Sequence, residues 1–289
     1  MSFHTVTEVM TVKPARRRRR GSRFGWILSA LTWLVALLIV FPFVWMVITA
    51  VKSEVDAVTY PPKLFFEPTL DQFRIAFENN FLPFFQNSIT ASVVSVLLVI
   101  VLALPAAYSL SIRPIRRWKD VLFFLLSTRM LPIAGAIIPI YLIANQLGLL
   151  DQIVLLVIMY TAMNLPLAVW LIRSFMVEIP KEVLEAARVD GANFYQELYR
   201  VVLPMVAPGL AATALLCFIF SWNEFFLARS LTSVQAQTVP LYLVGFISTQ
   251  GLFLAKLSAA SLLATLPVVL AGLLAQKQLV RGLSLGAIK

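Results

Sequence analysis

Two groups of residues in this sequence combine types and spacings that suit recognition chemistry. The first is a charged stretch, Glu185-Ala186-Ala187-Arg188-Val189-Asp190-Gly191-Ala192, followed by Leu203-Pro204. Good helix formers precede Gly191, which permits a left-handed backbone and ends a helix. Asn193 can cap a second helix, because Gln196 three residues later completes a capping box. The stretch predicts two short helices and a tight turn whose small side chains let another protein approach; an ordinary interfacial amphipathic loop is the alternative.

The second group is Ser221-Trp222-Asn223-Glu224-Phe225, near the end of an apolar segment. An aromatic ring can stack on a sugar face, and the amide and carboxylate can bind hydroxyls. Polar residues at membrane depth are candidates for function. Alternatively, Trp222 belongs to an interfacial aromatic belt, and Asn223 and Glu224 hold helices together. Asn164, close to Pro166, either lines the same solute pathway or relieves a broken helical turn.

Other chemistry is scarce in the chain. His4 is the only histidine and Cys217 the only cysteine, so a disulfide within the chain is excluded and metal or nucleophile sites built on these residues are not expected. The phosphate-binding pattern G-x-x-x-x-G-K-[ST] is absent. We therefore expect no catalytic residues, no metal site and no ATP hydrolysis by that route.

Composition indicates a polytopic membrane protein. The 289 residues are 60% hydrophobic and 13% charged, about half the charged fraction of a soluble domain. A bilayer core needs roughly 20 apolar residues per helix. Six stretches qualify, at the approximate bounds Trp26–Val51, Ser88–Ile112, Val121–Ala144, Ile153–Ile172, Met205–Leu227 and Leu257–Ala275. The predicted fold class is all-α with six transmembrane helices.

The distribution of Lys and Arg predicts the orientation. With the N-terminus inside, the inner segments hold 18 of the 24 basic residues and the outer segments hold five. By the positive-inside rule, both termini and the Glu185 stretch are then cytoplasmic. The run Arg16–Arg20 fits orientation and contact with anionic lipid headgroups better than nucleic-acid binding. Arg129 falls within the third span, where we expect it to lie near the cytoplasmic end or to pair with an acid such as Glu224.

The charged stretch resembles a known family motif. Glu185-Ala186-Ala187, Gly191 four positions later, Val201, Leu203 and Pro204 match the EAA motif of the membrane subunits of ATP-binding-cassette (ABC) importers, with Val201 where isoleucine is usual. The resemblance covers nearly the whole chain after Arg23. It is similar to the smaller of the two maltose-type permease subunits, in a type I importer fold. This implies a basic tail at 1–25, a transmembrane domain at 26–289, and a cytoplasmic coupling loop at 178–204.

The resemblance also implies partners and roles. Glu185, Ala186, Ala187, Asp190, Gly191, Leu203 and Pro204 would couple the chain to a separate ATPase. Two ATPase subunits, holding ATP and Mg²⁺, would work with a second permease subunit and an extracytoplasmic solute-binding protein. The expected solute is a sugar, oligosaccharide or sugar alcohol crossing the cytoplasmic membrane.

The outer segment from Arg229 to Lys256 is a further candidate by resemblance. Its polar residues Ser248, Thr249, Gln250 and Gly251 would contact the binding protein; a loop that only connects two spans is the alternative. An ion-coupled secondary transporter is the competing functional hypothesis. It would require intramembrane acids at a broken helix and repeat symmetry, and neither is evident in the sequence.

Overall fold

The computed structural model describes residues 23–248 and 251–286. The predicted contact residues Thr249 and Gln250, and the run Arg16–Arg20, lie outside the described residues. The chain divides into two compact units, residues 1–45 and 46–289.

The described part of the first unit is a single helix. It forms most of α1 (Arg23–Ala50), whose last residues belong to the second unit. Large apolar side chains are exposed along it, including Trp26, Trp33 and Phe41. A helix that is apolar on every side suits a hydrocarbon environment. Helix α1 therefore corresponds to the first predicted span.

The second unit contains the remaining elements, and nearly all of them are helices. They are α2 (Glu54–Val58), α3 (Asp71–Glu78), α4 (Phe81–Ser111), α5 (Trp118–Met130), α6 (Ile133–Gln146), α7 (Ile153–Val177), α8 (Lys181–Val189), α9 (Phe194–Gln196), the π-helix η1 (Glu197–Val202), α10 (Leu203–Trp222), α11 (Phe226–Leu231), α12 (Val239–Val244), β1 (Ile247–Ser248), β2 (Gly251–Leu252) and α13 (Leu254–Gly286). The two short strands pair antiparallel, with Ser248 opposite Gly251.

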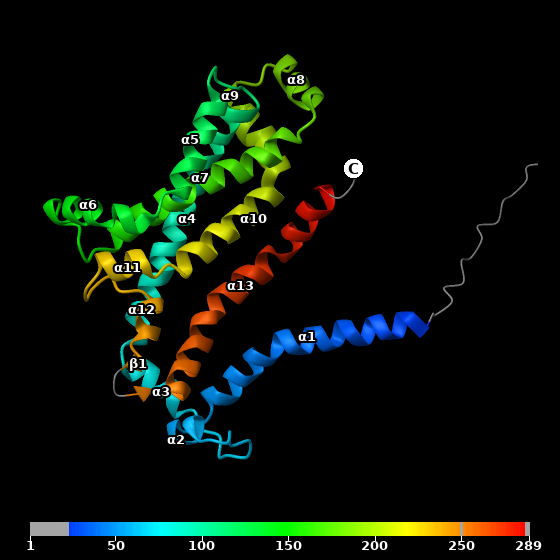
Figure 1. Cartoon of the computed structure of the whole chain (residues 1–289). Helices are drawn as coiled ribbons and strands as arrows, with labels where there is room; N and C mark the ends of the chain where they lie inside the picture. Colours follow the sequence, from blue (N-terminus) through cyan, green and yellow to red (C-terminus); the bar gives the residue numbers. More distant parts are fainter. Residues whose placement is uncertain (1–22, 249–250, 287–289) are drawn as a thin grey trace, which may run out of the picture. The chain divides into compact units, whose positions relative to one another are not determined.

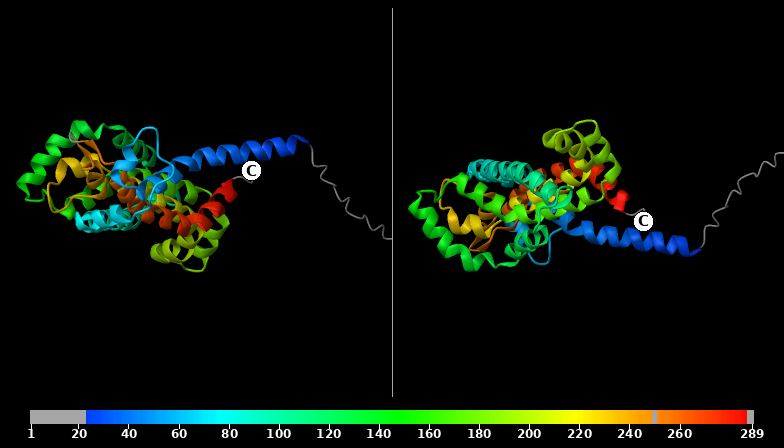
Figure 2. Two further views of the ribbon diagram at one scale, coloured as in Figure 1. Left: turned by 90° about the horizontal axis from the view of Figure 1, so that it is seen from below. Right: turned by 90° about the horizontal axis from the view of Figure 1, so that it is seen from above.

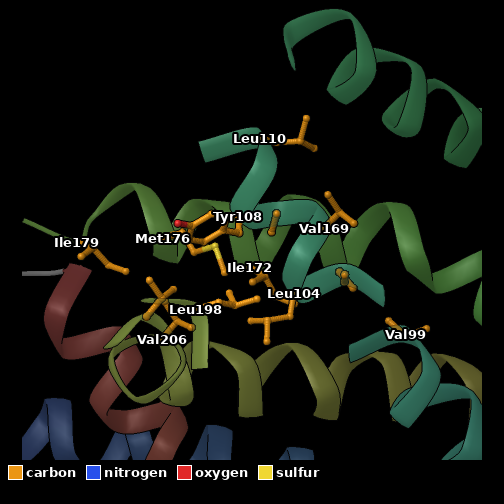
Figure 3. Close-up of a cluster of buried hydrophobic side chains, with 14 of the residues drawn as sticks. Val99, Leu104, Tyr108, Leu110, Val169, Ile172, Met176, Ile179, Leu198 and Val206 are labelled. Carbon is orange, nitrogen blue, oxygen red and sulfur yellow. The ribbon is translucent and has the colours of Figure 1, made fainter. Parts of the chain in front are cut away.

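Four long helices form the bundle of the second unit. Helix α4 packs along α7, and α10 contacts α4, α7 and α13 (Figures 1 and 2). Their main core gathers large buried side chains such as Tyr108, Ile172, Met176 and Leu198 (Figure 3). Fully buried alanines on α4 and α7 lie in the same core, and small residues of this kind let membrane helices approach closely.

Within the described residues, five helices are long and apolar enough to cross a membrane, and α5 with α6 makes a sixth crossing if this bent pair is one span. The third predicted span, Val121 to about Ala144, is therefore not one straight helix: α5 and α6 meet at 90°. Pro132 disfavours a helical conformation at the residue before it, and Leu131 is extended with ψ 131°. The fifth predicted span also ends earlier than expected, at Trp222 instead of about Leu227.

The two ends of the bundle carry different elements. Helix α4 begins next to α3, and helices α8 and α9 lie at the other end, near the last turn of α4 (Figure 1). The charged stretch singled out from the sequence is therefore at one end of the second unit, and the short helices α2 and α3 are at the opposite end.

Candidate functional site

The first candidate region is the turn between α8 and α9. Gly191 has a φ of +81°, in the left-handed region, as the sequence predicts. The N–H of Gly191 donates to the carbonyl of Arg188 at 3.1 Å, and the N–H of Ala192 donates to that of Ala187 at 3.0 Å. These two bonds form a Schellman motif, which satisfies carbonyls at the end of α8.

The next turn is also fixed by local hydrogen bonds. The Asn193 side chain accepts from the N–H of Gln196 at 3.0 Å, and the Gln196 side chain accepts from the N–H of Asn193 at 2.9 Å. The predicted capping box is therefore confirmed. Helix α9 then continues as η1 into α10, so that the whole stretch is ordered backbone.

The predicted coupling residues of α8 form an open surface on an anchored helix. Glu185, Ala186 and Asp190 are exposed, and Ala187 is half-buried. On the opposite face, Leu184 is buried in the main core. Of the two residues that begin α10, Leu203 packs against that core and Pro204 is exposed. The small residues of α8 are thus accessible from outside while Leu184 holds the helix in place.

A buried carboxylate that sequence reasoning missed ties this loop to the bundle. The Glu197 side chain has no exposed surface, although the partner arginine side chains are 47% and 40% exposed. Its Oε2 accepts from Nη2 of Arg113 at 2.6 Å, and its two oxygens accept from Nη2 and Nε of Arg188 at 2.9 and 3.2 Å. We call these three residues the Glu197 cluster.

The Glu197 cluster is electrostatically matched. The hydrogen bond to the Glu197 carboxylate raises the pKa of the Arg113 guanidinium, and the same cause raises the pKa of Arg188. A buried carboxylate is costly unless it is paired and hydrogen-bonded. No sequence pattern marks Glu197, because its partners Arg188 and Arg113 lie nine and 84 positions away.

The second candidate region surrounds Trp222 and Asn223. Trp222 is buried and packs edge-on against Phe85 and stacked on Phe218, with ring centroids 5.8 and 5.7 Å apart. Asn223 is exposed at the end of α10. Both residues line a cavity of about 310 Å³, together with Val239, Pro240, Leu243, Ser261, Ala264, Thr265 and Val268. The cavity therefore combines an indole ring with an amide and hydroxyl groups.

Glu224 and Asn164 are placed away from this cavity lining. The Glu224 carboxylate accepts from the backbone N–H groups of Leu227 and Ala228 at 2.9 to 3.2 Å, so it caps the start of α11. Asn164 is wholly buried, and its Nδ2 donates to the carbonyl of Tyr160 and to Ser221 Oγ, each at 3.0 Å. In this structure neither side chain lines the cavity beside Trp222.

Arg129 has partners other than the acid suggested from the sequence. Its Nη1 donates to the carbonyl of Met163 at 2.5 Å, and its guanidinium lies 5.2 Å from the centroid of the Phe220 ring. Glu224 is instead committed to α11. The bend between α5 and α6 places Arg129 beside α7, where a backbone carbonyl and an aromatic face replace the expected carboxylate.

In the turn between α6 and α7, Asp151 organises the segment before α12. Its carboxylate accepts from four consecutive backbone N–H groups, those of residues 233–236, at 2.9 to 3.1 Å. Burial would raise the pKa of this carboxyl, but the hydrogen bonds from Gln235, Ser233, Ala236 and Val234 outweigh it and hold the pKa well below its usual range. The α6–α7 turn therefore fixes the start of the outer segment that contains Ser248 and Gly251.

A bundle of membrane-length helices, with a cavity lined in part by polar groups and a charged helical loop at one end, is the architecture of a polytopic membrane protein. The family described as "Binding-protein-dependent transport system inner membrane component" matches residues 99–283. The chain belongs to this family, and the all-helical importer fold predicted from the sequence is confirmed.

Individual relatives agree with this assignment. The chain is 38% identical over 265 residues to a probable ABC transporter permease protein, y4oR, of Sinorhizobium fredii, covering 91% of this chain and 95% of the relative. It is 32% identical to the diacetylchitobiose uptake system permease protein DasC of Streptomyces coelicolor, covering 93% and 99%. A solved chain of a bacterial ABC transporter involved in the import of the acidic polysaccharide alginate superposes with a TM-score of 0.71 and 26% identity, covering 90% of this chain and 97% of that one.

Proposed function

We propose that this chain is one permease subunit of an ABC importer that moves a sugar, oligosaccharide or sugar alcohol across the cytoplasmic membrane. The proposal depends above all on α8, which presents Glu185, Ala186 and Asp190 on an exposed face while Leu184 anchors the opposite face. A helix held in this way can transmit a push from a soluble partner, because its position relative to the bundle is fixed. Membership of the importer family supports the same role.

In this proposal the energy comes from separate subunits. Two ATPase subunits that bind ATP and Mg²⁺ grip α8, and their closure biases the bundle between inward-facing and outward-facing states. The remaining partners are a second permease subunit, an extracytoplasmic binding protein and membrane lipid. Both chain termini are cytoplasmic, on the same side as α8, as the distribution of Lys and Arg predicts.

The cavity beside Trp222 supports a carbohydrate as the solute. The Trp222 ring forms part of the apolar lining of this cavity, and Asn223, Ser261 and Thr265 offer groups for the hydroxyls of a sugar. Relatives named for diacetylchitobiose uptake and for trehalose/maltose transport support the same class. We assign Trp222 and Asn223 to the solute pathway. The outer hairpin with Ser248 and Gly251 is assigned to contact with the binding protein.

Reconstitution tests this function directly. The chain is purified with its second permease, its ATPase and its binding protein, and placed in lipid vesicles with a panel of labelled disaccharides, oligosaccharides and polyols. Uptake of at least one member that requires Mg²⁺-ATP and the binding protein is expected. Uptake driven by an ion gradient without nucleotide would instead support the secondary transporter.

A matched pair of variants tests the cavity. Trp222→Phe keeps an aromatic ring at this buried position but removes the indole, and it should reduce uptake; assembly of the four components is measured on the same variant. Trp170→Phe makes the same substitution at a tryptophan on α7 that is 43% exposed and does not line this cavity, so uptake should stay close to the unmodified level. Equal uptake by both variants would remove Trp222 from the solute pathway.

A further inference from the structure

The Glu197 cluster joins two parts of the chain that are distant in sequence. Arg188 belongs to the last turn of α8 and lies nine positions before Glu197, so this arm acts within the loop itself. Arg113 follows the end of α4 and lies 84 positions away, so its arm crosses to another helix. One buried carboxylate thus holds α8 and the end of α4 together.

The crossing arm matters because α4 has no direct chain connection to this loop. Helix α8 is already joined through the backbone to α7 on one side and, through α9 and η1, to α10 on the other. The end of α4 reaches the loop through side chains: the Arg113–Glu197 ion pair, and the Tyr108 ring that meets Phe194 edge-on at 5.1 Å. Since α4 packs along α7 and against α10, a force applied to its end reaches the centre of the bundle.

The two arginines bind the Glu197 carboxylate in different ways. The Arg188 side chain binds both carboxylate oxygens, an arrangement that holds a carboxylate in a definite orientation. Arg113 makes one further bond, from its Nη2 to Oε2 at 2.6 Å. Removal of Arg113 therefore leaves Glu197 paired with Arg188 and leaves the loop itself intact, so the link to α4 can be tested separately.

We propose that Glu197 is a positioning residue that clamps α8 to the end of α4, so that the two helices move as one body when the partner ATPase subunits close. This proposal rests on the proposed function, because it requires a nucleotide-driven displacement of α8. It adds a defined route: from α8 through Arg188, Glu197 and Arg113 into α4, one of the helices that form the main core.

The test measures the separation of α8 and α4 in the assembled transporter. Spin labels are attached at Glu182→Cys on the exposed surface of α8 and at Val101→Cys, a position on α4 that is 65% exposed, with the buried Cys217 replaced by alanine. Distances are recorded by double electron–electron resonance in lipid nanodiscs. The probe is the Mg²⁺ complex of a non-hydrolysable ATP analogue, added or omitted.

The clamp predicts one narrow distance distribution that stays the same when the nucleotide is added. Arg113→Gln, which cuts only the crossing arm, should broaden this distribution and make its mean shift with nucleotide. Arg116→Gln is the matched control, because Arg116 is exposed in the same loop and makes no ion pair among the described residues. It should behave like the unmodified chain.

Either of two results would overturn the clamp. A nucleotide-dependent change of the α4–α8 distance in the chain that retains Arg113 would show that the helices move separately, and this measurement needs no variant that has to fold. A distribution in Arg113→Gln as narrow as in the control would show that the ion pair does not hold them. A complex of the unlabelled chain that neither binds nor hydrolyses ATP would refute the proposed function instead; ATPase activity is measured without labels because Glu182 lies on the helix proposed to dock the ATPase.

Discussion

Substitution of Gly191 by valine tests the turn on which the docking surface depends. The backbone there has a φ of +81°, and a Cβ placed on it meets no atom within 4 Å. A valine would therefore not clash within this chain, and its cost would come from the left-handed backbone. That cost is roughly 1–2 kcal/mol for an ordinary residue and larger for a β-branched one.

This strain can be relieved by opening the Schellman turn, which would displace the end of α8 and the Asp190 side chain. A loss of 1–2 kcal/mol corresponds to a change of about 5–30-fold in an equilibrium constant. We therefore expect the ATPase subunit to bind Gly191→Val at least about fivefold more weakly than the unmodified permease, measured by surface plasmon resonance on permease in nanodiscs.

Two companion variants separate the causes. Gly191→Asn introduces a residue that tolerates the left-handed region, so its binding to the ATPase subunit should fall less than that of Gly191→Val. Gly135→Ala changes another glycine with open space around it but without a positive φ, and binding should not change. If Gly191→Val binds the ATPase subunit as tightly as the unmodified chain, the reasoning about this turn is wrong.

Three further predictions concern stability, each followed by thermal unfolding in detergent. Because the pKa of Asp151 is lowered in the folded protein, its contribution to stability is complete above its ordinary pKa of about 3.9 and is lost as pH falls toward the folded-state value. Asp151→Asn should abolish this part of the acid sensitivity of unfolding, and an unchanged dependence of the unfolding temperature on pH would contradict the prediction. Gly209→Ala places a Cβ against the Phe175 ring on α7, with Cε2 at 2.6 Å, and should destabilise the folded protein by about 1–3 kcal/mol. Combining it with Phe175→Leu should recover part of the lost stability. Asn164→Leu removes the bonds to Tyr160 and Ser221 and should cost about 1–3 kcal/mol without changing which solute is taken up; altered solute preference in a stable variant would return Asn164 to the pathway.

Local signals in the sequence were sufficient for five of the six predicted spans and for the turn of the charged stretch. Apolar length alone located the long helices, since a helix in hydrocarbon satisfies its own backbone groups. The left-handed Gly191 and the capping box of Asn193 with Gln196 depend on atoms within a few residues of each other. For this reason they could be read without knowledge of the packing.

The contacts between helices could not be read in the same way. Arg113 and Glu197 meet across 84 positions, Arg129 finds the carbonyl of Met163 rather than Glu224, and the third span turns through 90° at Leu131 and Pro132. Each outcome depends on how neighbouring helices pack, and composition or spacing does not specify that packing. The sequence by itself therefore determined the membrane class, the apolar segments and the exposed small-residue motif. The tertiary structure decided which charges are buried together. A buried charge is costly unless it is paired, and the partner that can pair with it is the one that the fold brings within hydrogen-bond distance.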